Sequence, residues 1–158
     1  DSLKEMRPKY KTRNGRTVYG GGGITPDIYI PYSTKTTNAV QKIIGHPKRP
    51  IFNWASSYTD NYKLHKSLDN YRSFKDNWAL PLKHHTDFLQ YLETEGIETD
   101  SVYTDEETEL LGLRIKAEIA GIVWGRNEAT GVRLTEDNQV QEGIKYFDEA
   151  SVFINHSF

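Results

Sequence analysis

The chain has 158 residues, a net charge of −2 and no cysteine, which is the size of one domain with a core of its own. The lack of cysteine excludes disulfides, a thiolate nucleophile and thiolate metal ligands, and the near-zero charge gives no field that would attract nucleic acid or an anionic membrane. No apolar run approaches the ~18 residues of a membrane helix. From the charge we therefore expect no nucleic-acid partner, and from the lack of an apolar run we expect no membrane segment in this chain.

The first 31 residues are predicted to be rich in β-structure. Asn14-Gly15 lies between alternating β-forming residues, and this dipeptide favours a tight hairpin because both turn residues take positive φ. The glycine run 20–23 follows. Pro26 holds Thr25 extended, and Ile28 and Ile30 then indicate another short strand.

Residues 32–81 have mixed patterns. A short helix is predicted over 38–45, and a longer one from Pro50 to about His65, where the apolar residues follow helical spacing. Residues 67–79 fit either a helical face or a loop that straps the domain.

From Pro81 onward the pattern is helical. One helix is predicted from Pro81 to Gly96, and Thr104 with Glu107 forms a capping box at the start of the next. That second helix is apolar around most of its circumference and stops at Gly125, so we expect it to be central. A last helix is predicted over 136–155. The expected fold class is therefore α+β: a short glycine-rich β-hairpin and strand lead-in followed by a mainly α-helical domain.

Two separate stretches resemble one family. The sequence NGRTVYGGGGITPDI contains Gly23-Ile24-Thr25-Pro26-Asp27, and LRIKAEIAGIVWG at 113–125 is followed by RLTEDN at 133–138. They resemble the segment that closes the catalytic core and the C-terminal helical extension of carboxyl-terminal processing (tail-specific) serine peptidases, in particular the Bacteroidetes-type members.

The resemblance implies a segment without catalytic residues. In that family the serine and lysine of the catalytic dyad lie upstream of the glycine-rich segment, and nothing in this chain matches their motifs. Residues 1–31 would be the end of the peptidase core and 32–158 a C-terminal helical domain. The chain begins at Asp1 rather than at a methionine, as a piece of a longer protein would.

The function implied by the resemblance is that of a serine endopeptidase acting on envelope proteins in the periplasm. This segment would scaffold the enzyme or restrict its substrates, and it would be inactive alone. Protein or peptide substrates would bind through the missing peptidase core. The alternative is a free-standing module for peptide binding, protein binding or dimerisation. An isolated two-stranded hairpin is marginal in water. Pairing of the hairpin with a second copy of the chain would stabilise it, so a homo-oligomer is a further alternative.

Two groups of residues could bind a ligand, but neither has the sequence pattern of a known ligand site. The glycines at 20–23 lack the Gly-Lys-Ser/Thr sequence and the following helix of a phosphate-binding loop. His84 and His85 with Asp87 are the best metal candidate, joined loosely by the other histidines. However, neighbouring helical residues point about 100° apart, and metal-binding spacings are missing. These other histidines are His46, His65 and His156.

Catalytic groups are likewise not expected. None of the candidate serines lies in a Gly-x-Ser-x-Gly elbow or a Ser-x-x-Lys motif. The acidic pairs Glu106-Glu107 and Glu136-Asp137 lie at predicted helix starts, where capping explains them. We therefore expect no catalytic, cofactor-binding or metal-binding residue and no cofactor. The serines considered are Ser33, Ser56, Ser57, Ser67 and Ser73.

Aromatic residues offer one further kind of site. Aromatic side chains recur in peptide-binding grooves, although core packing is their commoner use in helices. Core packing is preferred for Trp124, whereas Trp54 and Trp78 stay open between a groove and the core. The set comprises Trp54, Trp78 and Trp124 with Tyr58, Tyr62 and Tyr71. The basic stretch 4–16 and the acidic stretch 93–109 are taken as solvated surfaces.

Overall fold

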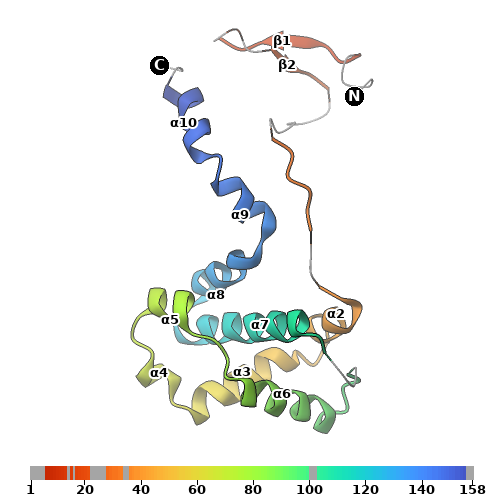
Figure 1. The fold of residues 1–158 in the computed structure, drawn as a ribbon, viewed down its shortest axis with the longest axis vertical. Helices are drawn as coiled ribbons and strands as arrows, with labels where there is room; N and C mark the ends of the chain where they lie inside the picture. Colours follow the sequence, from red (N-terminus) through yellow and green to blue (C-terminus); the bar gives the residue numbers. More distant parts are fainter. Residues whose placement is uncertain are drawn as a thin grey trace. The chain divides into compact units, whose positions relative to one another are not determined.

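A computed structural model describes residues 6–13, 15, 17–21, 28–33, 36–99 and 103–155, the last four of them as backbone only. It confirms the α+β class, with a small antiparallel sheet near the N-terminus and helices thereafter (Figure 1). The chain forms two compact units. One combines Asp1–Tyr32 with Gln139–Phe158, and the other is Ser33–Asn138.

The predicted hairpin is present in the first unit. Strands β1 (Lys9–Lys11) and β2 (Thr17–Tyr19) pair antiparallel, with Tyr10 opposite Val18. Gly15 has φ of +78°, as the turn signal requires, and its N–H donates to Thr12 O at 2.9 Å. Because Lys11 pairs with Thr17, the connection is longer than the two-residue Asn-Gly turn that we predicted. The expected Gly-Ile-Thr-Pro-Asp corner lies outside the described residues.

The strand predicted at Ile28 and Ile30 is wrong, since residues 28–33 carry no ladder bonds in the described part. Ile30 contacts α9 (Asn138–Ile144) instead. Gln139 Nε2 donates to Ile30 O at 2.9 Å, and a Cβ on Gly143 would lie 4.0 Å from Ile30 Cδ1. The backbone carbonyl of Ile30 is thus satisfied by a side chain rather than by a neighbouring strand.

The single last helix predicted over 136–155 is also wrong. The chain there forms α9 and, separately, α10 (Phe147–Asn155). Between them, Lys145 N donates to Glu142 O and Tyr146 N donates to Gly143 O, both at 3.1 Å. These i→i−3 bonds close a tight turn, and Gly143 disfavours a continuous helix at that point.

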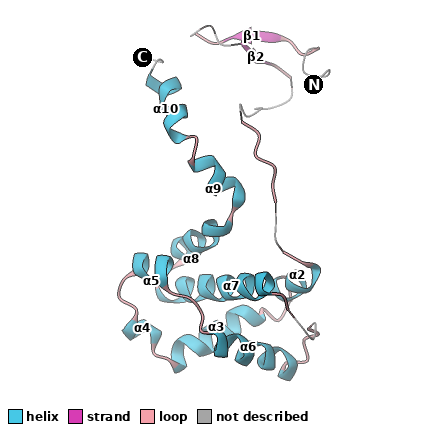
Figure 2. Cartoon of the chain, viewed as in Figure 1, coloured by secondary structure: helices cyan, strands magenta, loops and turns pink. Residues whose placement is uncertain are grey.

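In the described residues of the Ser33–Asn138 unit, all regular secondary structure is helical (Figure 2). In Figure 1, α7 runs through the middle, with α3 and α6 on one side and α5 and α8 on the other. The elements are α2 (Asn38–Ile44), α3 (Pro50–Asn61), α4 (Leu64–Ser67), α5 (Tyr71–Asn77), α6 (Leu82–Thr94), α7 (Asp105–Val123), α8 (Arg126–Arg133) and the 3₁₀ turn η1 (Leu134–Glu136).

The helices predicted at 38–45 and from Pro81 to Gly96 are confirmed as α2 and α6. The helix predicted to continue to His65 ends earlier, because Lys63 adopts left-handed geometry with φ of 52° and separates α3 from α4. Residues 67–79, for which the sequence allowed either a helical face or a loop, contain α5. Helix α8 was not predicted, and it begins after Gly125, whose φ of 133° turns the chain sharply.

Helix α7 is central, as its apolar circumference predicted. It packs against α3, α8 and α2. Its buried residues are Glu107, Leu111, Gly112, Ile115, Ala117, Ile119 and Ala120. The hydrophobic core to which α7 contributes also contains the fully buried residues Val40, Phe88, Leu92 and Val132. No helix in the described part of the chain combines the length and apolarity needed to cross a bilayer.

The starts of α2 and α7 are joined through one carboxylate. The predicted capping box is confirmed: Glu107 N donates to Thr104 Oγ1 at 3.2 Å, and Thr104 N donates to Glu107 Oε2 at 2.8 Å. The other carboxylate oxygen accepts from Thr37 Oγ1 at 2.5 Å, and Thr37 also caps α2 by accepting from Val40 N at 3.4 Å. First the Thr37 hydroxyl and then the Thr104 amide hold the pKa of Glu107 below its ordinary value.

We predict that Glu107 makes the fold sensitive to acid. A carboxyl whose pKa is lowered by folding stabilises the protein above its ordinary pKa of 4.5, and that contribution is lost as the pH falls through the lower pKa of the folded state. Glu107→Gln should therefore show a smaller loss of Tm than the wild type between about pH 6 and about pH 3. Thermal unfolding followed by circular dichroism at both pH values measures this.

The matched control is Glu106→Gln, which removes an exposed carboxylate from the same first turn of α7. It should keep the acid sensitivity of the wild type. Equal pH profiles for the wild type and Glu107→Gln would contradict the role given to Glu107.

Candidate binding pocket beside Trp78

The turn between α4 and α5 builds a small pocket from a single stretch of sequence. Leu68 ends α4 in an extended conformation. Asn70 is the N-cap of α5, and its Oδ1 accepts from Ser73 N at 2.9 Å. At the other end, Trp78 N donates to Phe74 O at 3.0 Å before the chain becomes extended at Trp78. The two extended ends thus place Leu68 and Trp78 on either side of α5.

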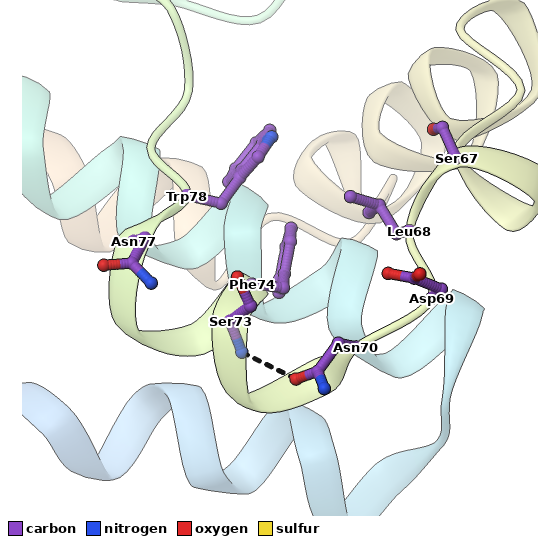
Figure 3. A pocket seen from close by; sticks show the side chains of 8 residues that line it. All are labelled: Ser67, Leu68, Asp69, Asn70, Ser73, Phe74, Asn77 and Trp78. Carbon is purple, nitrogen blue, oxygen red and sulfur yellow. Dashed lines mark hydrogen bonds between the residues drawn. The ribbon is translucent and has the colours of Figure 1, made fainter.

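The pocket has a volume of about 310 Å³ and is open to solvent. Figure 3 shows Leu68, Phe74 and Trp78 as its apolar side chains, with the Asp69 carboxylate directed toward the space between them. Phe74 is buried, whereas Leu68 and Trp78 are half-buried. The complete lining is Ser67, Leu68, Asp69, Asn70, Ser73, Phe74, Asn77 and Trp78.

The apolar side of the pocket is held by a chain of aromatic contacts. Phe74 stacks on Trp78 with ring centroids 4.9 Å apart and lies 5.1 Å from the Trp124 ring. Tyr71 meets Trp124 edge to face at 5.7 Å, and its hydroxyl donates to Glu128 O at 3.0 Å. These contacts attach the short helix α5 to the end of α7 and to α8, so the pocket wall is fixed by the core.

A half-buried lysine supports the same wall from α7. Lys116 Nζ donates to Lys75 O at 2.8 Å, near the C-terminus of α5, and lies 5.6 Å from the centre of the Phe74 ring. Burial lowers the pKa of the Lys116 ammonium, and the carboxylate of Asp76 partly opposes this effect. A cation near the last carbonyls of a helix interacts favourably with its negative end.

Trp54 and Trp78, which the sequence assigned to either a groove or the core, have different environments. Trp54 is buried in the core, stacked on Tyr58 at 4.9 Å and edge to face with Phe88 at 5.5 Å. Trp78 lines the pocket. Trp124 packs against the core, as predicted. Trp78 also packs against the core, and of the three tryptophans it is the one that lines the pocket, so it is the candidate for contact with a ligand.

The predicted metal candidates do not form one site. His84 Nδ1 lies 2.8 Å from Asp87 Oδ2, and the imidazole contacts the rings of Tyr58 and Tyr62 at 5.0 Å each. Burial raises the pKa of the Tyr58 phenol, with further contributions from Tyr62 and Asp87. No group of three or more His, Asp or Glu side chains among the described residues converges as a metal site would.

His85 points to a different neighbour. A Cβ on Gly112 of α7 would lie 2.6 Å from His85 Cε1, so the glycine allows α6 and α7 to approach each other. Burial lowers the pKa of the His85 imidazole, while a backbone hydrogen bond at Leu80 opposes the shift. The different surroundings of His84 and His85 agree with their expected angular separation on a helix.

The remaining histidines are dispersed. His46 Nδ1 accepts from Lys48 N at 3.2 Å, and His65 Nε2 lies 3.8 Å from Asp60 Oδ1. His156 lies outside the described residues, as do Gly22 and Gly23 of the weighed phosphate loop.

The weighed catalytic groups are also separated or engaged locally. Ser57 Oγ donates to Asn53 O one turn earlier, at 3.2 Å. Ser67 and Ser73 line the pocket instead. Glu107 serves as the cap that the sequence predicted, whereas Glu136 lies in η1.

The sequence reasoning missed the polar lining of the pocket. Asp69 and Asn77 were not singled out, and Asn70 was not identified as a helix cap. The available signal was Asn70 immediately before Tyr71, which shares a helical face with Phe74, because asparagine is a favoured N-cap. That signal would have placed the start of α5, although not the pocket beside it.

We predict a coupling between Tyr71 and Gly131. A Cβ on Gly131 would clash with the Tyr71 hydroxyl, whereas its contact with Tyr71 Cζ would be an ordinary 3.4 Å. Tyr71→Phe should cost about 1 kcal/mol through the lost hydrogen bond. Gly131→Ala should destabilise the wild type, yet stabilise the Tyr71→Phe variant by up to about 1 kcal/mol, the usual gain from alanine in a helix.

Urea unfolding of the four proteins gives the four free energies. If Gly131→Ala changes the stability by the same amount in both backgrounds, the close approach of α5 to α8 is not as described.

The helical unit also carries the similarity to known proteins. A family profile described as a family of unknown function (DUF8443) matches residues 47–125, which is half of the chain and spans α3 to α7. No curated protein and no solved structure is significantly similar to the chain. By the extent of the profile match, this chain belongs to the DUF8443 family.

Proposed function

We propose that this chain is the non-catalytic C-terminal part of a carboxyl-terminal processing serine peptidase of the cell envelope. In this proposal an upstream serine attacks the peptide bond while a neutral lysine accepts its proton. The Ser33–Asn138 unit acts as a scaffold beside the peptidase core, or restricts which substrates reach it.

The observation that carries this proposal is the pair of resemblances in the expected order. The stretch LRIKAEIAGIVWG, which resembles the helical extension of those peptidases, corresponds to most of the central helix α7 and the glycine that ends it. A central buried helix suits a scaffold, because the surrounding helices are held in position by packing against it. The hairpin before the glycine run suits the strand–turn–strand that closes the peptidase core.

The chemistry of the described residues is compatible with a supporting role. The half-buried Lys116 donates its hydrogen bond to the backbone carbonyl of Lys75, not to a serine hydroxyl. The pocket-lining Ser67 and Ser73 are accompanied by amides and a carboxylate rather than by a base of the Ser–Lys type.

A second candidate is a free-standing module that binds peptides or proteins. The specific observation in its favour is Trp78, a half-buried tryptophan in the wall of an open pocket. The two candidates are compatible, because a substrate-restricting domain can also bind peptide.

We predict that the 158-residue chain alone has no peptidase activity. It should neither cleave unfolded casein nor become labelled by a fluorophosphonate, which acylates activated serines. The protein encoded by the complete reading frame should do both, since about 100–200 preceding residues would supply a Ser–Lys core. Gel-based labelling and casein cleavage, run in parallel on the two proteins, measure this.

A start codon directly before the codon of Asp1 would overturn the proposal, because no upstream Ser–Lys core would then be encoded. So would cleavage by the 158-residue chain that disappears after serine acylation, because the nucleophile would then lie within this segment.

A further inference from the structure

We propose that the pocket beside Trp78 binds an extended peptide by enclosing one of its apolar side chains, at a position inside the peptide rather than at its C-terminus. This inference rests on the peptide-binding candidate and is independent of whether a Ser–Lys core precedes the chain. The eight lining residues, from Ser67 to Trp78, form this Trp78 pocket.

The apolar part of the Trp78 pocket sets the kind of side chain that fits. Leu68 and the Phe74–Trp78 stack form its apolar walls. One face of the Trp78 ring is covered by Phe74, and the side chain remains half-exposed. Removing this surface from water by inserting an aliphatic or aromatic group is favourable.

The size of the pocket limits the occupant to a short stretch. Its volume of about 310 Å³ lies at the lower end of the range of about 300–1,000 Å³ for small-molecule sites. One side chain and the adjoining backbone fit this space, whereas a helix or a folded surface would need a longer groove.

The polar lining suits a peptide backbone. The side chains of Ser67, Ser73 and Asn77 form no hydrogen bond with other described residues, so they can bond a ligand. Hydroxyl and amide groups both donate and accept, and an extended backbone presents N–H and C=O groups alternately. Asn70 is different, because its Oδ1 is already occupied by the cap of α5.

Asp69 decides which part of a peptide is accepted. Its exposed carboxylate is directed toward the pocket, and it has no ion-pair partner among the described residues. It can accept from a backbone N–H, yet it repels a second carboxylate. A peptide that ended in the pocket would place its terminal carboxylate near Asp69, so an internal position is favoured.

A saccharide could use the same hydroxyl and amide groups, but the walls favour a peptide side chain. Leu68 and Phe74 offer carbon surface without donors or acceptors. A sugar ring could pack only its C–H face there, because a hydroxyl directed against carbon loses its hydrogen bonds to water, whereas a leucine-type side chain carries no hydroxyl at all. The peptide is therefore the occupant that we propose, and binding of a saccharide instead is one outcome of the test.

The test uses the 158-residue chain and defined peptides. The first probe is acetyl-Gly-Ser-Leu-Ser-Gly-amide, the second replaces Leu by Asp, and the third is acetyl-Gly-Ser-Leu with a free carboxylate. Binding is followed by NMR, because the three tryptophans give one indole N–H signal each. The first probe should shift the Trp78 signal saturably with a Kd of about 1 mM, leave those of Trp54 and Trp124 in place, and bind more tightly than the other two.

Variants of the lining separate binding from folding. Asn77→Ala should weaken the first probe about fivefold through a lost hydrogen bond. Asp69→Asn should strengthen the third probe about twofold to fivefold, because the repulsion is removed. Asp76→Asn is the matched control: it changes an aspartate of α5 outside the lining and should alter binding by less than about twofold.

Trp78→Ala should abolish binding, but it also removes the stacking on Phe74, so the milder Asn77 and Asp69 variants keep the test valid if that protein unfolds. The proposal is overturned if the first probe leaves the Trp78 signal unchanged, or if Asn77→Ala binds as well as Asp76→Asn. It is also overturned if the free-carboxylate peptide is preferred in the wild type, or if an N-acetylglucosamine oligomer shifts Trp78 while the peptides do not.

Discussion

The Ser33–Asn138 unit depends on the burial of α7, a helix that is apolar around most of its circumference. Such a helix cannot face water on any broad side, so neighbours must cover it from several directions. Helices α3, α8 and α2 do so, and Ile115 and Ile119 are completely buried as a result. The positions of the other helices follow from this requirement.

Three charged side chains of α7 bind groups on surrounding helices or helix starts. Glu107 accepts from Thr37 at the start of α2, Lys116 donates to Lys75 O of α5, and Glu118 pairs with Arg133 of α8 at 2.8 Å. Because half-buried charges are costly without partners, these contacts specify which element lies at each end of α7. They also hold α5 in place, and with it the wall of the Trp78 pocket.

The two functional proposals use different parts of this arrangement. The peptidase proposal depends on the resemblance of α7 and the N-terminal hairpin to a known enzyme family, and it assigns the chemistry to residues upstream. The peptide-binding inference depends on side chains between Ser67 and Trp78, all of which lie within the stretch matched by the DUF8443 profile. A domain that binds peptide beside a peptidase core would unite them, because substrate capture and cleavage could then occur on one chain.

The sequence alone determined the α+β class, the hairpin, the capping box at Thr104 and the central position of α7, because turn chemistry, capping and apolar periodicity act between residues close in the chain. Tertiary structure decided the rest. The break between α9 and α10 and the loss of the strand at Ile30 depend on where the backbone bonds are satisfied. The roles of Trp54 and Trp78 depend on which neighbours cover each ring. A pocket forms only where side chains leave space unfilled, and local sequence patterns do not show how completely the space is filled.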